Sequence, residues 1–282
     1  MNSCQKYFSV CALTLLTQAA FAQSAPSLGS ASSFTVLSAA PNGGGAVTCT
    51  DSSVTGDVGS SGLAASVVQT SCAITGAVVA PVSAAVVADF NSAYDQLGLA
   101  QCDRVLTTLD GQVLSPGVYC VDAAATSTGS VLTLAGSSNA TWIFRIGTLG
   151  TGALTGTNFS VVAQGGSALA CNQVYWQVAQ AVTMTDSQFV GTVLAGAAVT
   201  LTRGTFNGDA LAKAAVTLTG VTVTGCESSG SVNPPHKQKC NQSVGNGPEG
   251  CDPGNSNQGN PFRSNDELGG VPGNPGRKGG NK

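Results

Sequence analysis

The sequence contains few charged or aromatic residues and a single histidine. Of its 282 residues only 9% are charged and 5% are aromatic, and the formal net charge is −3. So little charge provides no basic surface for binding nucleic acid. His236 alone offers little for a histidine-based metal site or general base. The scarcity of aromatic rings, together with 37 glycines and 42% hydrophobic residues, indicates a core of small side chains in repeating layers. We expect no cofactor.

The first 22 residues have the features of a secretory signal peptide. Lys6 precedes an apolar run from Tyr7 to Leu16, and Ala20-Phe21-Ala22 is a small-x-small cleavage site. The run is shorter than the roughly 20 residues that a membrane-spanning helix needs, and no later run is long enough. We therefore expect cleavage after Ala22, export to the extracellular space or the periplasm, and no membrane span.

Eight cysteines remain once Cys4 and Cys11 are removed with the signal peptide. An even number in an exported chain favours disulfides over metal binding, and none of them belongs to a C-x-x-C pair. Sequence spacing does not determine the pairing, although Cys102–Cys120 and Cys240–Cys251 are candidate local pairs. The eight are Cys49, Cys72, Cys102, Cys120, Cys171, Cys226, Cys240 and Cys251.

The composition changes abruptly after Cys226. Residues 227–282 consist largely of Gly, Asn, Pro, Ser and charged residues, so they cannot bury enough surface to offset chain entropy. The acids in this segment do not follow the spacing of an EF-hand calcium loop. We therefore predict a folded domain over residues 23–226, followed by a disordered tail. These acids are Glu249, Asp252, Asp266 and Glu267.

One segment, residues 80–101, has the apolar spacing of a helix. Pro81 suits its first turn and Gly98 its end. The rest of the domain is typical of short strands separated by Gly, Asn, Asp or Ser. The apolar residues of the helix are Val86, Val87, Phe90, Ala93, Tyr94 and Leu97.

A pentapeptide of the form Ala-Val-Thr-x-Thr occurs four times. Three copies, starting at Ala181, Ala198 and Ala215, are spaced 17 residues apart, and a fourth starts at Ala46. The similarity extends beyond the pentapeptide, because residues 46–58 can be aligned with residues 198–210. Repeats with a fixed period are typical of solenoids, in which each repeat contributes one coil.

Each copy alternates like a β-strand that has one buried face. The valine and the variable residue share the inward side, so the alanine and both threonines point outward. Because stacked coils place equivalent residues about 4.8 Å apart, we expect two rows of threonine on one face. The members of these rows, which are the expected binding residues, are Thr48, Thr50, Thr183, Thr185, Thr200, Thr202, Thr217 and Thr219.

The expected rows contain no charged residue. Threonine favours exposed strands in any protein, but exposed strands of soluble proteins usually carry charge for solubility and edge protection. The array therefore indicates a functional surface. Its stiff methyl and hydroxyl groups repeat with spacings that approximate those of oxygen atoms on planes of ice. A second, less regular candidate surface lies on the strand after each repeat, with residues Gln188, Thr192, Thr205, Asn207, Thr222 and Thr224.

Several further motifs occur in an order shared with one protein family. They are residues 28–37 (LGSASSFTVL), 55–59 (TGDVG), 114–119 (LSPGVY), 142–147 (WIFRIG) and 171–178 (CNQVYWQV). Together they resemble the secreted ice-binding (antifreeze) proteins of the DUF3494 type from cold-adapted microbes, over almost the whole domain. This family has no universal binding motif, so the threonine assignment rests on the repeat.

The resemblance implies a mostly β fold. The expected architecture is a discontinuous right-handed parallel β-helix, triangular in section, with one long α-helix packed alongside. The resemblance also implies that an early coil lies beside the C-terminal coils. A small cap closed by a disulfide is expected between Cys102 and Cys120.

A polysaccharide-cleaving β-helix is the enzyme alternative, and it requires clustered acids and bases in a groove. Asp57 and Asp209 follow glycine at matched repeat positions and would be neighbours, but acids at such positions are typical turn formers. Arg203 and Lys213 are isolated in the sequence. No nucleophile motif is present, so we expect no catalytic residues.

The large aromatic residues Trp142, Tyr175 and Trp176 lie in apolar strands and are expected in the core rather than in a sugar-binding platform. A secreted adhesin or carbohydrate-binding β-helix without ice activity remains the alternative function. The favoured hypothesis is a monomeric, non-enzymatic protein that adsorbs to the surface of ice crystals and restrains ice growth and recrystallisation.

Overall fold

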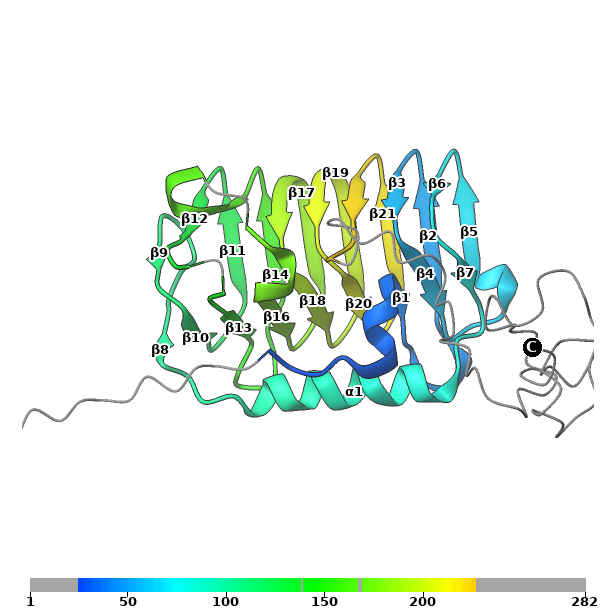
Figure 1. Cartoon of the computed structure of the whole chain (residues 1–282), viewed down its shortest axis with the longest axis horizontal. Coiled ribbons are helices and arrows are strands. Elements are labelled where there is room, and N and C mark those ends of the chain that lie inside the picture. Colours follow the sequence, from blue (N-terminus) through cyan, green and yellow to red (C-terminus); the bar gives the residue numbers. More distant parts are fainter. Residues whose placement is uncertain (1–24, 138, 167–168, 227–282) are drawn as a thin grey trace, which may run out of the picture. The chain divides into compact units, whose positions relative to one another are not determined.

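The computed structural model describes residues 25–137, 139–166 and 169–226. The expected signal peptide, the tail (residues 227–282) and the candidate pair Cys240–Cys251 lie outside these ranges. The described chain forms stacked coils of parallel β-strands beside one long helix, which confirms the predicted fold class (Figure 1). Short 3-10 turns connect some of the strands, namely η1 (Gly29–Ser33), η2 (Pro41–Gly43), η3 (Ala64–Ser66), η4 (Gln164–Gly166) and η5 (Cys171–Gln173).

The strands of successive coils lie on three walls. The first, here called the threonine wall, contains the repeated pentapeptides. Its strands pair in parallel throughout. In order of pairing they are β5 (Val67–Thr70), β2 (Val47–Thr50), β21 (Val216–Thr219), the first part of β19 (Val199–Asn207), the first part of β17 (Val182–Val190), β14 (Leu154–Thr157) and β11 (Ala125–Thr128).

The second wall follows the threonine wall across a corner in each coil. Because β17 and β19 bend at this corner, each of them contributes to both walls. The strands of the second wall are β6 (Ala73–Ile74), β3 (Ser53–Thr55), β22 (Thr222–Thr224), the second parts of β19 and β17, β15 (Ser160–Ala163), β12 (Val131–Leu134) and β9 (Val113–Leu114).

The third wall, here called the helix wall, is covered by α1 (Ala84–Leu99) and by η1. Apolar residues of this wall that point out of the coils pack against the helix instead of facing water. Its strands, in order of pairing, are β7 (Val78–Val79), β4 (Asp57–Ser60), β1 (Phe34–Ser38), β20 (Ala210–Ala212), β18 (Thr192–Ala195), β16 (Val174–Val178), β13 (Trp142–Ile146), β10 (Gly117–Val121) and β8 (Arg104–Val105).

Helix α1 is shorter than the predicted segment. It begins after Ser83, whose hydroxyl accepts a hydrogen bond from the backbone N–H of Val86, so Pro81 precedes the helix rather than lying in its first turn. Gly98 lies inside the helix, and the guanidinium of Arg145 donates to the carbonyl oxygens of Gly98 and Ala100. The predicted apolar stripe is confirmed, because the buried residues of the helix are Val86, Phe90, Ala93 and Leu97.

The stack of coils is discontinuous in sequence. On the helix wall β1 lies between β4 and β20, and on the threonine wall β2 lies between β5 and β21. The N-terminal coils therefore extend the stack beyond the last C-terminal coil, and α1 leads the chain back to the opposite end, where β8 begins (Figure 1). This confirms the implied contact between an early coil and the C-terminal coils.

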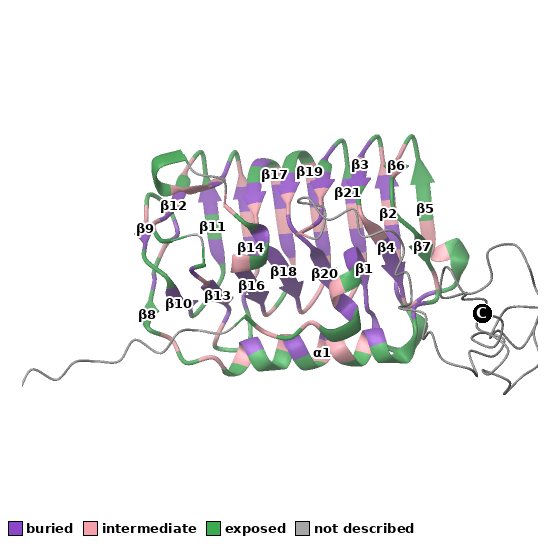
Figure 2. Cartoon of the chain, viewed as in Figure 1, coloured by how far each residue is buried: buried purple, intermediate pink, exposed green. Residues whose placement is uncertain are grey.

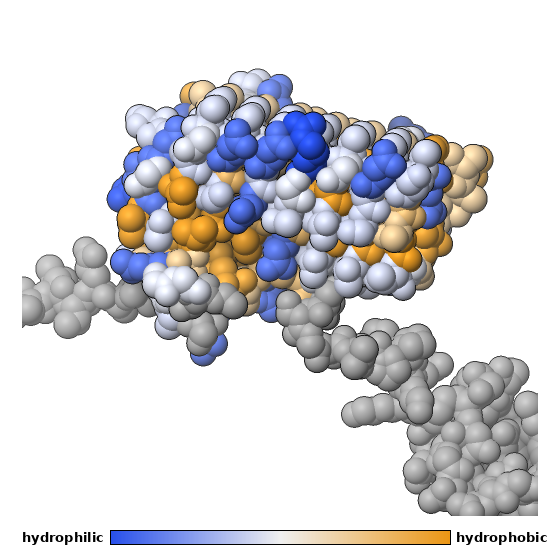
Figure 3. Space-filling model, turned by 90° about the horizontal axis from the view of Figure 1, so that it is seen from above, coloured by the Kyte–Doolittle hydropathy of each residue, from blue (hydrophilic) through white to orange (hydrophobic). Residues whose placement is uncertain are grey.

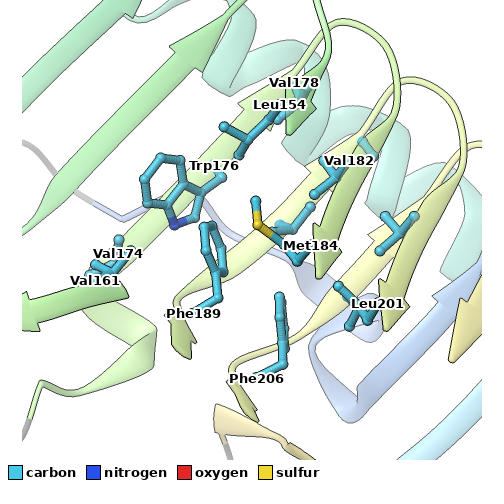
Figure 4. Packing of buried hydrophobic residues seen from close by; sticks show 14 of the residues in the cluster. Leu154, Val161, Val174, Trp176, Val178, Val182, Met184, Phe189, Leu201 and Phe206 are labelled. Carbon is cyan, nitrogen blue, oxygen red and sulfur yellow. The ribbon is translucent and has the colours of Figure 1, made fainter. Parts of the chain in front are cut away.

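The interior is filled by aliphatic side chains and one row of neighbouring aromatic rings (Figure 4). The ring centroids of Phe144 and Trp176 are 4.0 Å apart, those of Trp176 and Phe189 4.8 Å, and those of Phe189 and Phe206 5.5 Å. The first and third pairs are stacked and the second is tilted, and ring contacts of both kinds add to the hydrophobic contribution of the rings. Trp142, Tyr175 and Trp176 are all buried, as predicted.

Three disulfides connect the described cysteines. They join Cys49 to Cys72, Cys102 to Cys120, and Cys171 to Cys226. The local prediction Cys102–Cys120 is confirmed. The partners of Cys49 and Cys171 are brought near by the fold rather than by sequence spacing.

Candidate functional site

The threonines of the threonine wall form two straight rows. Parallel register places equivalent residues side by side from β5 to β11, with Val68 of β5 as the exception in the first row. The first row consists of Thr48, Thr217, Thr200, Thr183, Thr155 and Thr126. The second row consists of Thr70, Thr50, Thr219, Thr202, Thr185, Thr157 and Thr128.

All eight residues expected from the sequence lie in these rows, and the structure adds five more. Thr126, Thr128, Thr155 and Thr157 belong to coils whose strands read Ala-x-Thr-x-Thr, with alanine or leucine in place of the valine. A search for that looser pattern would have found them. Thr70 lies in β5, where the repeat has degenerated to Ser-Val-Val-Gln-Thr, and the sequence carried no clear signal for it.

A row of alanines runs beside the first row of threonines. Backbone hydrogen bonds join successive coils there, for example from Val182 N–H to the carbonyl of Ala198, and from Val199 N–H to that of Ala215. The wall thus presents three parallel rows of short uncharged side chains. The alanines are Ala153, Ala181, Ala198, Ala215 and Ala46.

The rows are held flat by the residues that alternate with them. The inward valines Val47, Val182, Val199 and Val216 are fully buried. Most threonines of the rows are half-buried, and only Thr219 and the threonines of β5 and β11 are exposed (Figure 2). Neighbouring threonines therefore cover part of each other, and β-branching further restricts their rotamers. Both effects limit the freedom of the threonine side chains.

The threonine hydroxyls of the two rows are available to solvent. Within the described part of the chain, no hydrogen bond joins any of them to another protein group. Each can therefore donate to and accept from ordered water, while the adjacent methyl group offers an apolar contact. An array of this composition suits a ligand with a regular lattice of oxygen atoms.

The charged residues closest to the second row lie at the corner beside it. The chain turns there with a positive φ in every coil, at Gly129, Asn158, Asp186, Arg203, Gly220, Asp51 and Ser71. The guanidinium of Arg203 donates from Nε and Nη2 to the two carboxylate oxygens of Asp186, at 2.6 and 2.7 Å. In Figure 3 a row of hydrophilic residues runs along the molecule, next to surface of near-neutral hydropathy.

Two basic residues that the sequence left isolated have partners in the structure. Arg203 holds the pKa of Asp186 below its ordinary value, through hydrogen bonding first and charge second. Lys213 lies 3.8 Å from the ring centroid of Tyr94 and 3.9 Å from a carboxylate oxygen of Asp95. Neither cation lies on the two rows of threonine. Arg203 binds Asp186 at the corner, and Lys213 contacts Tyr94 and Asp95 of helix α1.

Five of the six residues of the second candidate surface lie on the second wall. Gln188, Thr205 and Thr222 share one outward row with Ser53, and Asn207 and Thr224 share the next. Thr192 does not belong to it, because it lies on the helix wall with 1% of its surface exposed and donates to Asp209. Toward the β9 end, this wall exposes apolar residues in place of threonine, including Val131.

The acid pair considered for an enzyme does not form a catalytic site. Strand β1 lies between the strands of Asp57 and Asp209, so the two residues are not neighbours. Asp57 accepts a hydrogen bond from the backbone N–H of Ala77, and Asp209 from that of Cys226. Both therefore stabilise turns, in line with the alternative given above. In the described ranges, no three His, Cys, Asp or Glu side chains are grouped as metal ligands.

A family model described as ice-binding-like matches residues 41–224 of the chain. The chain belongs to this family. Its matched region contains all of the strands from β2 to β22, including every row of the threonine wall. No curated protein matches the chain significantly.

Solved structures of ice-binding proteins share the fold. The ice-binding protein of the Antarctic ascomycete Antarctomyces psychrotrophicus is 30% identical, with 71% of this chain and 98% of the other covered and a TM-score of 0.61. A glycosylated ice-binding protein from an Arctic yeast is 29% identical over 71% and 94% of the two chains, with a TM-score of 0.61. The ice-binding protein of an Antarctic Flavobacteriaceae bacterium is 34% identical, with 71% of this chain and 47% of the other covered and a TM-score of 0.61.

Of the helices in the ice-binding-like domain described here, none is long and apolar enough to cross a bilayer.

Proposed function

We propose that this protein binds ice through the threonine wall and thereby restrains ice growth and recrystallisation. The observation that carries the proposal is the uncharged register of threonines, which is continuous in both rows from β11 to β2 and extends in the second row to β5. Membership of the ice-binding-like family and the ice-binding proteins of similar fold support it. The action requires adsorption alone, so no catalytic group is needed.

Free energy is available for adsorption because the surface is large and rigid. Each methyl group withdrawn from liquid water contributes at most about 0.8 kcal/mol. The two rows together would then contribute about 10 kcal/mol, before the costs of association. Half-buried, β-branched side chains lose little rotamer freedom on binding, which keeps the ordering cost low.

Secretion is part of the same proposal. Ice outside the cell is reached only by an exported protein, and the features of residues 1–22 support export. The disulfides among the described cysteines fit an oxidising compartment.

The proposal is tested by replacing Thr200, in the middle of the first row, with tyrosine. The ring would stand above the plane of the wall and hold neighbouring threonines away from ice, so we expect Thr200→Tyr to lose most thermal hysteresis while its melting temperature is unchanged. Thr222→Tyr on the second wall and Ala88→Tyr on the exposed side of α1 are matched controls, and both are expected to keep full hysteresis.

Two outcomes would contradict the assignment. Hysteresis lost in Thr222→Tyr but kept in Thr200→Tyr would move the site to the second wall. A wild-type protein that neither shapes ice nor shows hysteresis, but is retained by a cell-wall polysaccharide, would favour the adhesin alternative.

A further inference from the structure

Arg203 is an unusual residue for its place in the fold. It lies at the corner beside the second row of threonines, where each coil of the threonine wall turns with a positive φ, and its own φ is 56°. Long side chains rarely adopt this conformation, whereas glycine, asparagine and aspartate adopt it more readily. Arg203 is the one long side chain among these corner residues. The others are Gly129, Asn158, Asp186, Gly220, Asp51 and Ser71.

The side chain of Arg203 is within reach of the threonine rows. Arg203 follows Thr202 directly, and parallel register places Thr185 and Thr219 on either side of Thr202. Because arginine has a long stem with several rotatable bonds, a guanidinium at this corner can fold over these threonines. There it would stand, with its hydrating water, above a surface of short uncharged side chains. An unrestrained Arg203 would therefore obstruct part of the threonine wall.

Asp186 holds the guanidinium of Arg203 at the corner. Nε and Nη2 of Arg203 donate to the two carboxylate oxygens of Asp186 at 2.6 and 2.7 Å. Two parallel hydrogen bonds fix the orientation of a guanidinium as well as its position, which a single contact does not. Asp186 occupies the equivalent corner position in the adjacent coil. The pair therefore directs the arginine along the line of corners, parallel to the rows rather than across them.

No other group in the described part of the chain restrains Arg203 in this way. Asp186 is its only described hydrogen-bonding and ionic partner. The coil on the other side of Arg203 has Gly220 at its corner, which provides no side chain for pairing. The side chain of Arg203 is 59% exposed, so packing holds little of it in place. Without Asp186 the guanidinium would be free to move.

We propose that Asp186 is a positioning residue that keeps the threonine rows accessible by holding Arg203 along the corner. This inference rests on the proposed function, because it concerns the access of ice to the threonine wall. Exposed ion pairs contribute little to the stability of a fold. The role of this pair should therefore be visible in binding rather than in the melting temperature.

Glycine variants of the corner residues test this proposal through thermal hysteresis. Glycine suits these positions, because it adopts a positive φ without strain and occupies the same corner at Gly129 and Gly220. We expect Asp186→Gly to lose about half of the wild-type hysteresis or more, because the released arginine samples positions over the rows. Arg203→Gly should keep full hysteresis, and the double variant Asp186→Gly/Arg203→Gly should recover it. Asp51→Gly, which removes a corner carboxylate that has no arginine in an adjacent coil, is the matched control and should keep full hysteresis.

Three results would overturn the positioning role while leaving ice binding intact. Full hysteresis in Asp186→Gly would show that a released Arg203 does not obstruct the wall. A double variant as impaired as Asp186→Gly would show that the carboxylate acts without the arginine. An equal loss in Asp51→Gly would assign the effect to corner charge in general. A folded wild type without hysteresis would instead overturn the proposed function, and this inference with it.

Discussion

At the scale of single residues, the threonine wall combines two properties that seldom occur together on an exposed strand. Threonine supplies a hydroxyl for water and a stiff methyl for apolar contact, while the buried valines between the rows keep the side chains level. The ionic groups closest to the rows lie at the corner, where Asp186 and Arg203 pair with each other. Charge therefore maintains solubility without interrupting the rows.

The pH dependence of ice binding follows from this separation. The pKa of Asp186 is lowered by Arg203, so its contribution to stability is complete above the unfolded pKa of about 3.9 and is lost only as the pH falls through the lower folded value. The two rows contain no titratable side chain. We expect thermal hysteresis to be constant between about pH 5 and pH 9, and a sigmoidal change within that range would show that an ionisable group takes part in binding.

At the scale of elements, the sequence predicted strands best where the pentapeptide copies follow one another at a constant spacing. The copies starting at Ala181, Ala198 and Ala215 follow each other at 17 residues, and all pair in the predicted register. Between β14 and β17 the coil contains a longer loop, which includes η4 and η5, and the period is lost although the register is kept. Coil length is set by loops on the other walls, so a fixed spacing could not detect Thr155 or Thr126.

The helix shows a second limit of sequence-based prediction. Its apolar stripe followed from spacing, but its start depended on the hydroxyl of Ser83, and its last turn is held by Arg145 from β13. A glycine near the end of a helical pattern was taken as the stop signal, whereas tertiary hydrogen bonds to the carbonyls of Gly98 and Ala100 extend the helix past it.

Helix α1 should contribute to stability without touching ice. Phe90 is fully buried between α1 and the helix wall. Phe90→Ala removes that ring and leaves a cavity, so we expect a loss of about 3–5 kcal/mol in the free energy of unfolding. Urea denaturation measures the change. Below the melting temperature thermal hysteresis should be retained, and its loss in a folded variant would show that the helix wall shapes the binding surface.

At the scale of the whole molecule, the discontinuous order of coils determines the extent of the threonine wall. Strand β2 lies next to β21 although the two are far apart in sequence, and this contact adds Thr48 and Thr50 to the rows formed by the C-terminal coils. Spacing alone could not predict that contact, because it depends on α1 leading the chain back along the stack. The resemblance to the ice-binding family implied this contact between an early coil and the C-terminal coils.

The most direct measurement of the central claim is the incorporation of the secreted protein into slowly growing ice. Wild type and Ala88→Tyr should be enriched in the ice relative to the remaining liquid, whereas Thr202→Tyr should be excluded from the ice like an ordinary soluble protein. Equal enrichment of Thr202→Tyr and wild type, or exclusion of the wild type itself, would contradict the claim that ice contacts the threonine wall.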